Sequence, residues 1–156
     1  MWILWTALLV LLPLGQDHHQ AMNDRGAKAM GFDQEKTVHH FLLFADGGAI
    51  DVAVRSSTDT QNRDAIRSHL GHIAMMFGSG DFNVPMLVHD TQDLPGVAVL
   101  SERTSVVRYQ YKDTPDGGRI DIVTRDPEAL AALHAFLTYQ IREHRTGDRE
   151  TVTDRK

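Results

Sequence analysis

The sequence predicts an α+β protein in which two ββα pseudo-repeats form a four-stranded antiparallel sheet with two helices on one face. Three observations predict this fold. Two Asp-Gly-Gly turns each join a pair of apolar runs, an amphipathic segment follows each pair, and DGGAIDV (46–52) recurs as DGGRIDI (116–122). One ββα unit cannot bury its own hydrophobic face, whereas two units together can.

The length and composition fit one globular domain. The chain has 156 residues, 42% of them hydrophobic and 24% charged, with a net charge of −5. No clustered Lys or Arg is available to offset phosphate charge, so we expect no nucleic-acid partner. The absence of cysteine excludes disulfides, thiolate metal sites and a cysteine nucleophile.

Residues 1–15, MWILWTALLVLLPLG, form an uncharged apolar run that ends abruptly in polar chain. The run is shorter than the roughly 20 residues that span a bilayer. We therefore expect a cleavable signal peptide, a periplasmic or secreted protein, and no stable membrane span after processing. An uncleaved membrane anchor is the alternative.

A polar segment containing His and Met, residues 16–36, is expected to precede the folded domain, 37–148. Asp17 is a candidate N-cap for a short helix from His18 to about Met30.

The first hairpin is expected from strands at 37–45 and 49–55, with Leu43 paired to Ile50 or Val52. Strand alternation places one apolar set, together with His39, on the side that the helices cover. His40, Leu42 and Phe44 point to the other side. The covered set comprises Phe41, Leu43, Ile50, Val52 and Val54.

A helix is expected over residues 60–77, where TDTQ (58–61) fits a capping box. Its apolar stripe consists of Ile66, Leu70, Ile73 and Phe77. Within 81–104, the segments PMLVHD and GVAVL favour short strands around a DLPG turn.

The second hairpin is expected from SVVRYQY and RIDIVT, around a TPDGG turn. The clearest helix follows over 126–144, with Asp126 as its N-cap, Pro127 in its first turn and Gly147 at its end. Residues 149–156 are expected to form a disordered tail.

No catalytic motif occurs: G-x-S-x-G, H-E-x-x-H, a Walker loop and G-x-G-x-x-G are all absent. We therefore expect a binding protein rather than an enzyme. The unusual feature is nine histidines and six methionines, most of them grouped as HHQAM (18–22), HH (39–40), HLGHIAMM (69–76) and MLVH (86–89).

These groups point to a metal site. His69, His72 and Met76 lie on one arc of the 60–77 helix, and His39 faces the same side from its strand. The segment with His18, His19 and Met22 is expected to close over them as an arm. Imidazole and thioether ligands without thiolate suit copper, so the predicted function is binding of a metal ion, copper first.

The chain also resembles exported bacterial proteins with an MGFDQEKT-HHFLL type stretch, here Met30 to Leu43, that end like LHAFLTYQIREHRTGD. The resemblance implies export. It implies no activity and no site residues, because these proteins are uncharacterised.

Several alternatives stay open. Leu42 and Phe44 on the outer sheet face indicate an accessory domain that binds a small molecule, a protein partner or a second copy. An enzyme with a site outside the known motifs, and haem binding, are further alternatives. Each histidine also has a structural interpretation: His39, His69 and His72 at the edge of the core, His134 within it, and His144 at a helix C-terminus.

Overall fold

The computed structural model describes the backbone of residues 14–155, and the side chains from His19 onward. Most of the predicted signal peptide therefore lies outside the described residues. Within this range no helix is both long and apolar enough to cross a membrane. The elements in chain order are α1 (Leu14–Met30), η1 (Gln34–Lys36), β1 (Thr37–Phe44), β2 (Gly47–Val54), α2 (Thr60–Gly78), α3 (Asn83–His89), α4 (Val97–Glu102), β3 (Val107–Thr114), β4 (Gly117–Thr124) and α5 (Pro127–His144).

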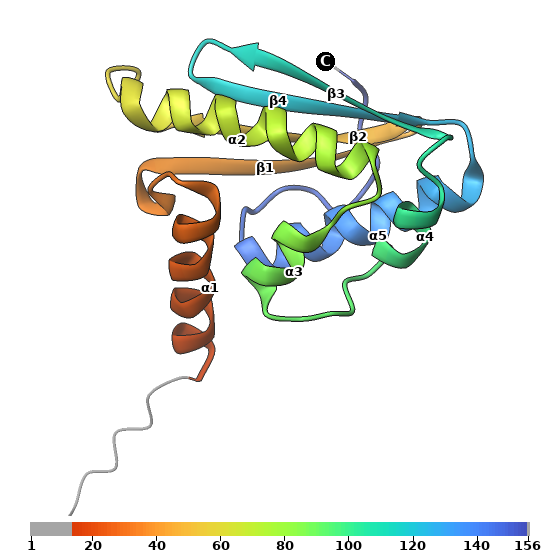
Figure 1. Cartoon of the computed structure of the whole chain (residues 1–156), viewed down its shortest axis with the longest axis horizontal. Helices are drawn as coiled ribbons and strands as arrows, with labels where there is room; N and C mark the ends of the chain where they lie inside the picture. Colours follow the sequence, from red (N-terminus) through yellow and green to blue (C-terminus); the bar gives the residue numbers. More distant parts are fainter. Residues whose placement is uncertain (1–13, 156) are drawn as a thin grey trace, which may run out of the picture.

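The four strands form one antiparallel sheet in the order β1-β2-β4-β3, which confirms the α+β prediction (Figure 1). The two hairpins meet at the centre, where Ile50 of β2 pairs with Ile120 of β4. The second hairpin has the boundaries of the first shifted by 70 residues, from 37–54 to 107–124. That the two halves superpose, helices included, stays a prediction.

The sheet has an inner face that the helices cover and an outer face with charged residues. The five side chains expected on the covered side are all buried. The predicted pairing of Leu43 is wrong, because Leu43 lies opposite Gly48 and Phe41 lies opposite Ile50. The turn consists of residues 45 and 46 alone, so both glycines join β2. At Gly47, with φ of 150°, a Cβ would lie 1.9 Å from the carbonyl oxygen of Ile122, so only glycine fits.

The two long helices pack on the inner face, each over the hairpin that it does not follow. α2 lies against β3 and β4, where a Cβ on Gly118 would touch Leu70. α5 lies against β1 and β2, where a Cβ on Gly48 would overlap Leu137. Because each helix crosses to the other hairpin, both halves share one core.

Two short helices, α3 and α4, occupy the region where the sequence favoured strands. Burial in α3 falls on Pro85, Val88 and His89, which is helical spacing, and in α4 on Val97 and Leu100. The expectation of strands is therefore wrong. Apolar runs this short do not distinguish a strand from a buried helix.

The helix boundaries differ slightly from those expected. α1 begins at Leu14, earlier than His18. Asp59 rather than Thr58 caps α2, by accepting a hydrogen bond from the Asn62 amide. Asp126 caps α5 as predicted, by accepting a hydrogen bond from the Ala129 amide.

The C-terminal tail, residues 146–155, follows the free edge of β1. The Asp148 carboxylate accepts a hydrogen bond from the Phe41 amide at 2.9 Å, and the Thr153 amide donates to the Leu43 carbonyl at 2.9 Å. The expectation of a disordered tail is therefore wrong. The free edge of β1 has backbone groups without a neighbouring strand, and the tail forms hydrogen bonds with them.

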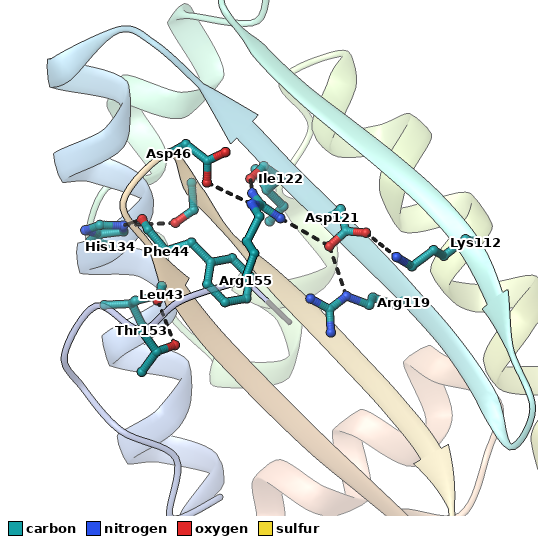
Figure 2. Close-up of polar contacts among 11 residues, drawn as sticks. Leu43, Phe44, Asp46, Lys112, Arg119, Asp121, Ile122, His134, Thr153 and Arg155 are labelled. Carbon is teal, nitrogen blue, oxygen red and sulfur yellow. Dashed lines mark hydrogen bonds and ion pairs between the residues drawn. The ribbon is translucent and has the colours of Figure 1, made fainter.

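Arg155 anchors the end of this tail on the outer face (Figure 2). Its guanidinium lies 4.5 Å from the centroid of the Phe44 ring and donates hydrogen bonds to Asp46, Asp121 and the Ile122 carbonyl. Phe44 is consequently only 3% exposed. Phe44 therefore forms no open apolar patch, because the tail of the same chain supplies its cover.

Candidate functional site

A cavity of about 70 Å³ lies on the inner side of the sheet, between β1, α2, α3 and α5. Its lining is apolar except for five side chains. Aromatic residues contribute much of the wall, and Met30 at the end of α1 contributes a thioether. The polar lining residues are His39, His69, His89, Gln140 and His144.

Four separate elements bring the four histidines together. His39 lies on the inner face of β1, because it shares the alternation of Phe41 and Leu43. His69 lies on α2 beside the buried Leu70. His89 and His144 are the last residues of α3 and α5.

The imidazole rings are close to one another. The centroids of His39 and His144 lie 5.7 Å apart with nearly parallel planes, and those of His144 and His89 lie 5.1 Å apart at nearly right angles. Phe32 packs against the rings of His39 and His69, at centroid distances of 5.9 and 5.7 Å. The histidines thus form a continuous cluster within an aromatic shell.

Burial keeps three of these imidazoles, those of His39, His69 and His144, neutral. It lowers the pKa of His39 to about 4, with a further contribution from the neighbouring His69. It also lowers the pKa of His69 to about 4. The pKa of His144 falls well below 6.5, because of burial first and then of His39, His89 and His19. Neutral imidazoles are the form that binds metal ions.

Nε2 of His39 and Nε2 of Gln140 are buried nitrogen atoms of the lining without a hydrogen-bond partner among the described residues. The other end of the Gln140 amide, Oε1, lies 3.0 Å from Nε2 of His89. Since Oε1 is an acceptor, this contact assigns the proton of His89 to Nε2. Unsatisfied buried polar atoms are uncommon and often mark a ligand site.

A second, more polar hollow lies next to the cavity, with His39 and His144 common to both. His19 and Asn23 of α1 and His40 of β1 also line it. His19 is close enough to His144 to lower its pKa. This hollow therefore adjoins the edge of the histidine cluster.

The structure brings together some of the predicted ligands and not others. His39 and His69 line the same cavity, and His19 lies in the adjoining hollow. His72 is exposed on α2, and Met76 packs against the core outside the cavity lining. Met22 is a core residue, 1% exposed. The side chain of His18 lies outside the described residues.

Sequence reasoning missed His144, His89, Met30 and Gln140 as members of the site. A signal for two of them was present, since Gln140 and His144 are one turn apart on α5, beside the buried Leu137 and Ile141. His89 belongs to the MLVH group (86–89), but its segment was interpreted as a strand, so its place in the cavity was not expected.

The other two histidines of the folded domain have structural roles. His40 lies on the outer side of β1 and contacts Asp148 at 2.8 Å through Nδ1. Nε2 of His134 lies 3.0 and 2.9 Å from the carbonyl oxygens of Phe44 and Gly47, and it therefore donates to the first hairpin turn. His134 is half-buried, so it lies at the margin of the core and not within it as expected.

Among the described residues, no three His, Asp or Glu side chains are already arranged to hold a metal ion. Binding of an ion by the cluster therefore requires rotation of imidazole rings. Comparison with protein families, with curated proteins and with solved structures finds no match for this chain.

Proposed function

We propose that the protein binds a copper ion in the histidine-lined cavity, through imidazoles of His39, His69 and His144 and the thioether of Met30. The observation that carries the proposal is the unpartnered Nε2 of His39 inside a cluster of neutral imidazoles. This imidazole nitrogen has no partner among the described residues, and a metal ion satisfies it in the tautomer that carries the proton on Nδ1.

The ring spacing supports a shared ion. Two imidazoles bound to one ion at about 2.0 Å, with about 120° between the two bonds, have centroids roughly 5.5 Å apart. The spacing between two of the proposed ligands, His39 and His144, is 5.7 Å. The nearly parallel rings of His39 and His144 must still rotate, because both nitrogens do not yet face one point.

The donor set favours copper over zinc. Zinc sites in proteins use thiolate, imidazole and carboxylate, and the cavity lining contains neither thiolate nor carboxylate. Met30 supplies a soft thioether next to the imidazoles, a combination that suits Cu(I). The apolar walls also favour the lower charge of Cu(I) over that of a divalent ion.

The test is an anaerobic titration of the protein with Cu(I) against a chromogenic Cu(I) chelator. We expect one tightly bound ion per chain. Alanine at His39, His69 or His144 should each weaken binding by about 100-fold or more, since the loss of a ligand costs more than the 10- to 100-fold typical of residues that only support ligands. Met30→Leu should weaken binding by about 10-fold, because a thioether is the weaker donor.

Two matched controls distinguish the histidines that bind the ion from neighbouring histidines that do not. His40→Ala removes the adjacent histidine of the same strand, and His72→Ala removes an exposed histidine of the same helix as His69. Both should leave Cu(I) affinity unchanged. Circular dichroism verifies folding of every variant, and His39→Gln provides a polar replacement if His39→Ala does not fold. Equal affinity in the folded variants at positions 39, 69 and 144 would refute the proposal.

A further inference from the structure

We infer that the bound metal keeps an open coordination position, and that Gln140 receives a small anion or metal-bound hydroxide there through its Nε2 amide group. This inference rests on the proposed function and adds the class of ligand that the site takes beyond the ion itself.

Gln140 carries the argument because its amide is satisfied at one end only. The residue is 4% exposed and lines the cavity from α5, one turn before His144. Its Oε1 is engaged by His89, whereas Nε2 has no hydrogen-bond partner among the described residues. A buried amide donor without an acceptor is unfavourable, so this arrangement fits a group that an anionic or hydroxide ligand completes.

The amide of Gln140 is oriented with Oε1 toward Nε2 of His89, at 3.0 Å. Its carbonyl end therefore faces α3, and the NH₂ group is the end left for the cavity. A ligand on the metal that accepts a hydrogen bond would satisfy it. A neutral apolar ligand, by contrast, would leave the NH₂ group unpaired.

The size and polarity of the cavity restrict this ligand to a few atoms. A water molecule needs about 10–15 Å³ of such space, so the cavity of about 70 Å³ has room for a metal ion and one small group. Its other walls are aromatic and aliphatic side chains, including Phe41 and Phe136. A bulky or multiply charged substrate does not fit these dimensions, whereas hydroxide or a triatomic monoanion does.

The experiment uses the copper-loaded protein in its Cu(II) form, with azide as the probe. Copper content is measured first. Azide is then titrated while the absorption and electron paramagnetic resonance spectra are recorded. We expect azide to bind the metal, with a new charge-transfer absorption and altered resonance parameters.

The decisive variant is Gln140→Glu, which keeps an acceptor for His89 but replaces the NH₂ donor by a carboxylate oxygen. We expect it to retain copper and to bind azide at least 10-fold more weakly than the unmodified protein. Gln140→Leu, which removes both polar ends, is expected to weaken azide binding as well. Gln110→Glu is the matched control, because Gln110 is exposed on the outer side of β3, and it should bind azide normally.

The possible outcomes distinguish a failure of this inference from a failure of the proposed function. A protein that binds no copper refutes the proposed function and the inference together. A copper-loaded protein whose spectra do not respond to azide has a closed site, which overturns the inference alone. Equal azide affinity in the unmodified protein and Gln140→Glu overturns the role of Gln140.

Discussion

His39 and His40 are consecutive residues of one strand, and they occupy opposite environments. His39 faces the helices, stacks against Phe32 and His144, and leaves its Nε2 buried without a partner among the described residues. His40 faces outward, is half exposed, and pairs with Asp148 of the C-terminal tail at 2.8 Å. Strand alternation alone separates a candidate ligand from a surface contact.

The same contrast extends to the two faces of the sheet. Inside, histidines share a small apolar cavity without a carboxylate in its lining. Outside, acids and bases are matched: Lys112 and Arg119 contact Asp121 at 2.7 and 2.9 Å, and Arg155 contacts it at 3.3 Å. Burial raises the pKa of Asp121, but hydrogen bonds from Lys112 and Arg119 outweigh this effect and lower it. The charged groups around Asp121 are therefore satisfied within the chain, whereas Nε2 of His39 and Nε2 of Gln140 on the inner side have no partner among the described residues.

Acid should destabilise the inner face first, and this is the largest expected effect on stability. Histidines with an unfolded pKa near 6.5 and a folded pKa near 4 take up protons mainly in the unfolded state between these values. The free energy of unfolding should therefore be constant above pH 6.5 and fall as the pH drops toward 4. The slope is at most about 1.4 kcal/mol per pH unit for each such histidine.

Urea unfolding at pH 7, 6, 5 and 4.5 measures this slope without metal. His39→Leu should reduce the slope of the free energy of unfolding against pH, because the unfolded state loses one group that accepts a proton. The leucine side chain still fills the cavity wall. His40→Leu tests the outer position under the same conditions. An unchanged slope in His39→Leu would contradict the neutral, buried state that we assign to this imidazole.

The fold was predictable to a large extent because its signals are local. The alternation around the two turns identified the covered face, and the 3.6-residue spacing identified α2 and α5. The register of β1 was not predictable, because Gly47 and Gly48 enter the strand for a tertiary reason: their missing side chains make room for Ile122 and Leu137.

The site was predictable only in part. His39 and His69 followed from the faces of one strand and one helix. His144 and His89 end helices whose relative positions depend on the packing of α3 and α5, which no local pattern specifies. Met76 was chosen by helical spacing from His69, but the thioether near the cavity is Met30, supplied by the end of α1.

The tail offers a smaller test of the outer face. Arg155→Ala should lower the free energy of unfolding by about 1 kcal/mol, because it removes a cation–π contact with Phe44 and partly exposed ion pairs. Arg149→Ala, an exposed residue of the same tail, is the matched control. Urea titration at pH 7 compares them, and equal stability of the two variants would show that the tail does not anchor the sheet through Arg155.

His40→Ala is expected to have the smallest effect on the free energy of unfolding. Its contact with Asp148 is half exposed, and exposed ion pairs contribute about 0.5 kcal/mol or less. Asp148→Ala should cost more, about 1 kcal/mol, because the carboxylate also accepts a hydrogen bond from the Phe41 amide. Urea unfolding measures the free energy of unfolding of both variants. A larger decrease in His40→Ala than in Asp148→Ala would contradict this division of roles.

The central claim is that the inner histidines, and not the outer ones, hold the metal. Nitrogen-15 NMR of imidazole side chains during titration with Cu(I), which is diamagnetic, tests it directly. The account predicts that the ring nitrogens of His39, His69 and His144 shift together and saturate at one equivalent, while those of His40 and His134 stay in place. Shifts confined to His18, His19, His40 or His72, with the inner rings unchanged, would contradict it.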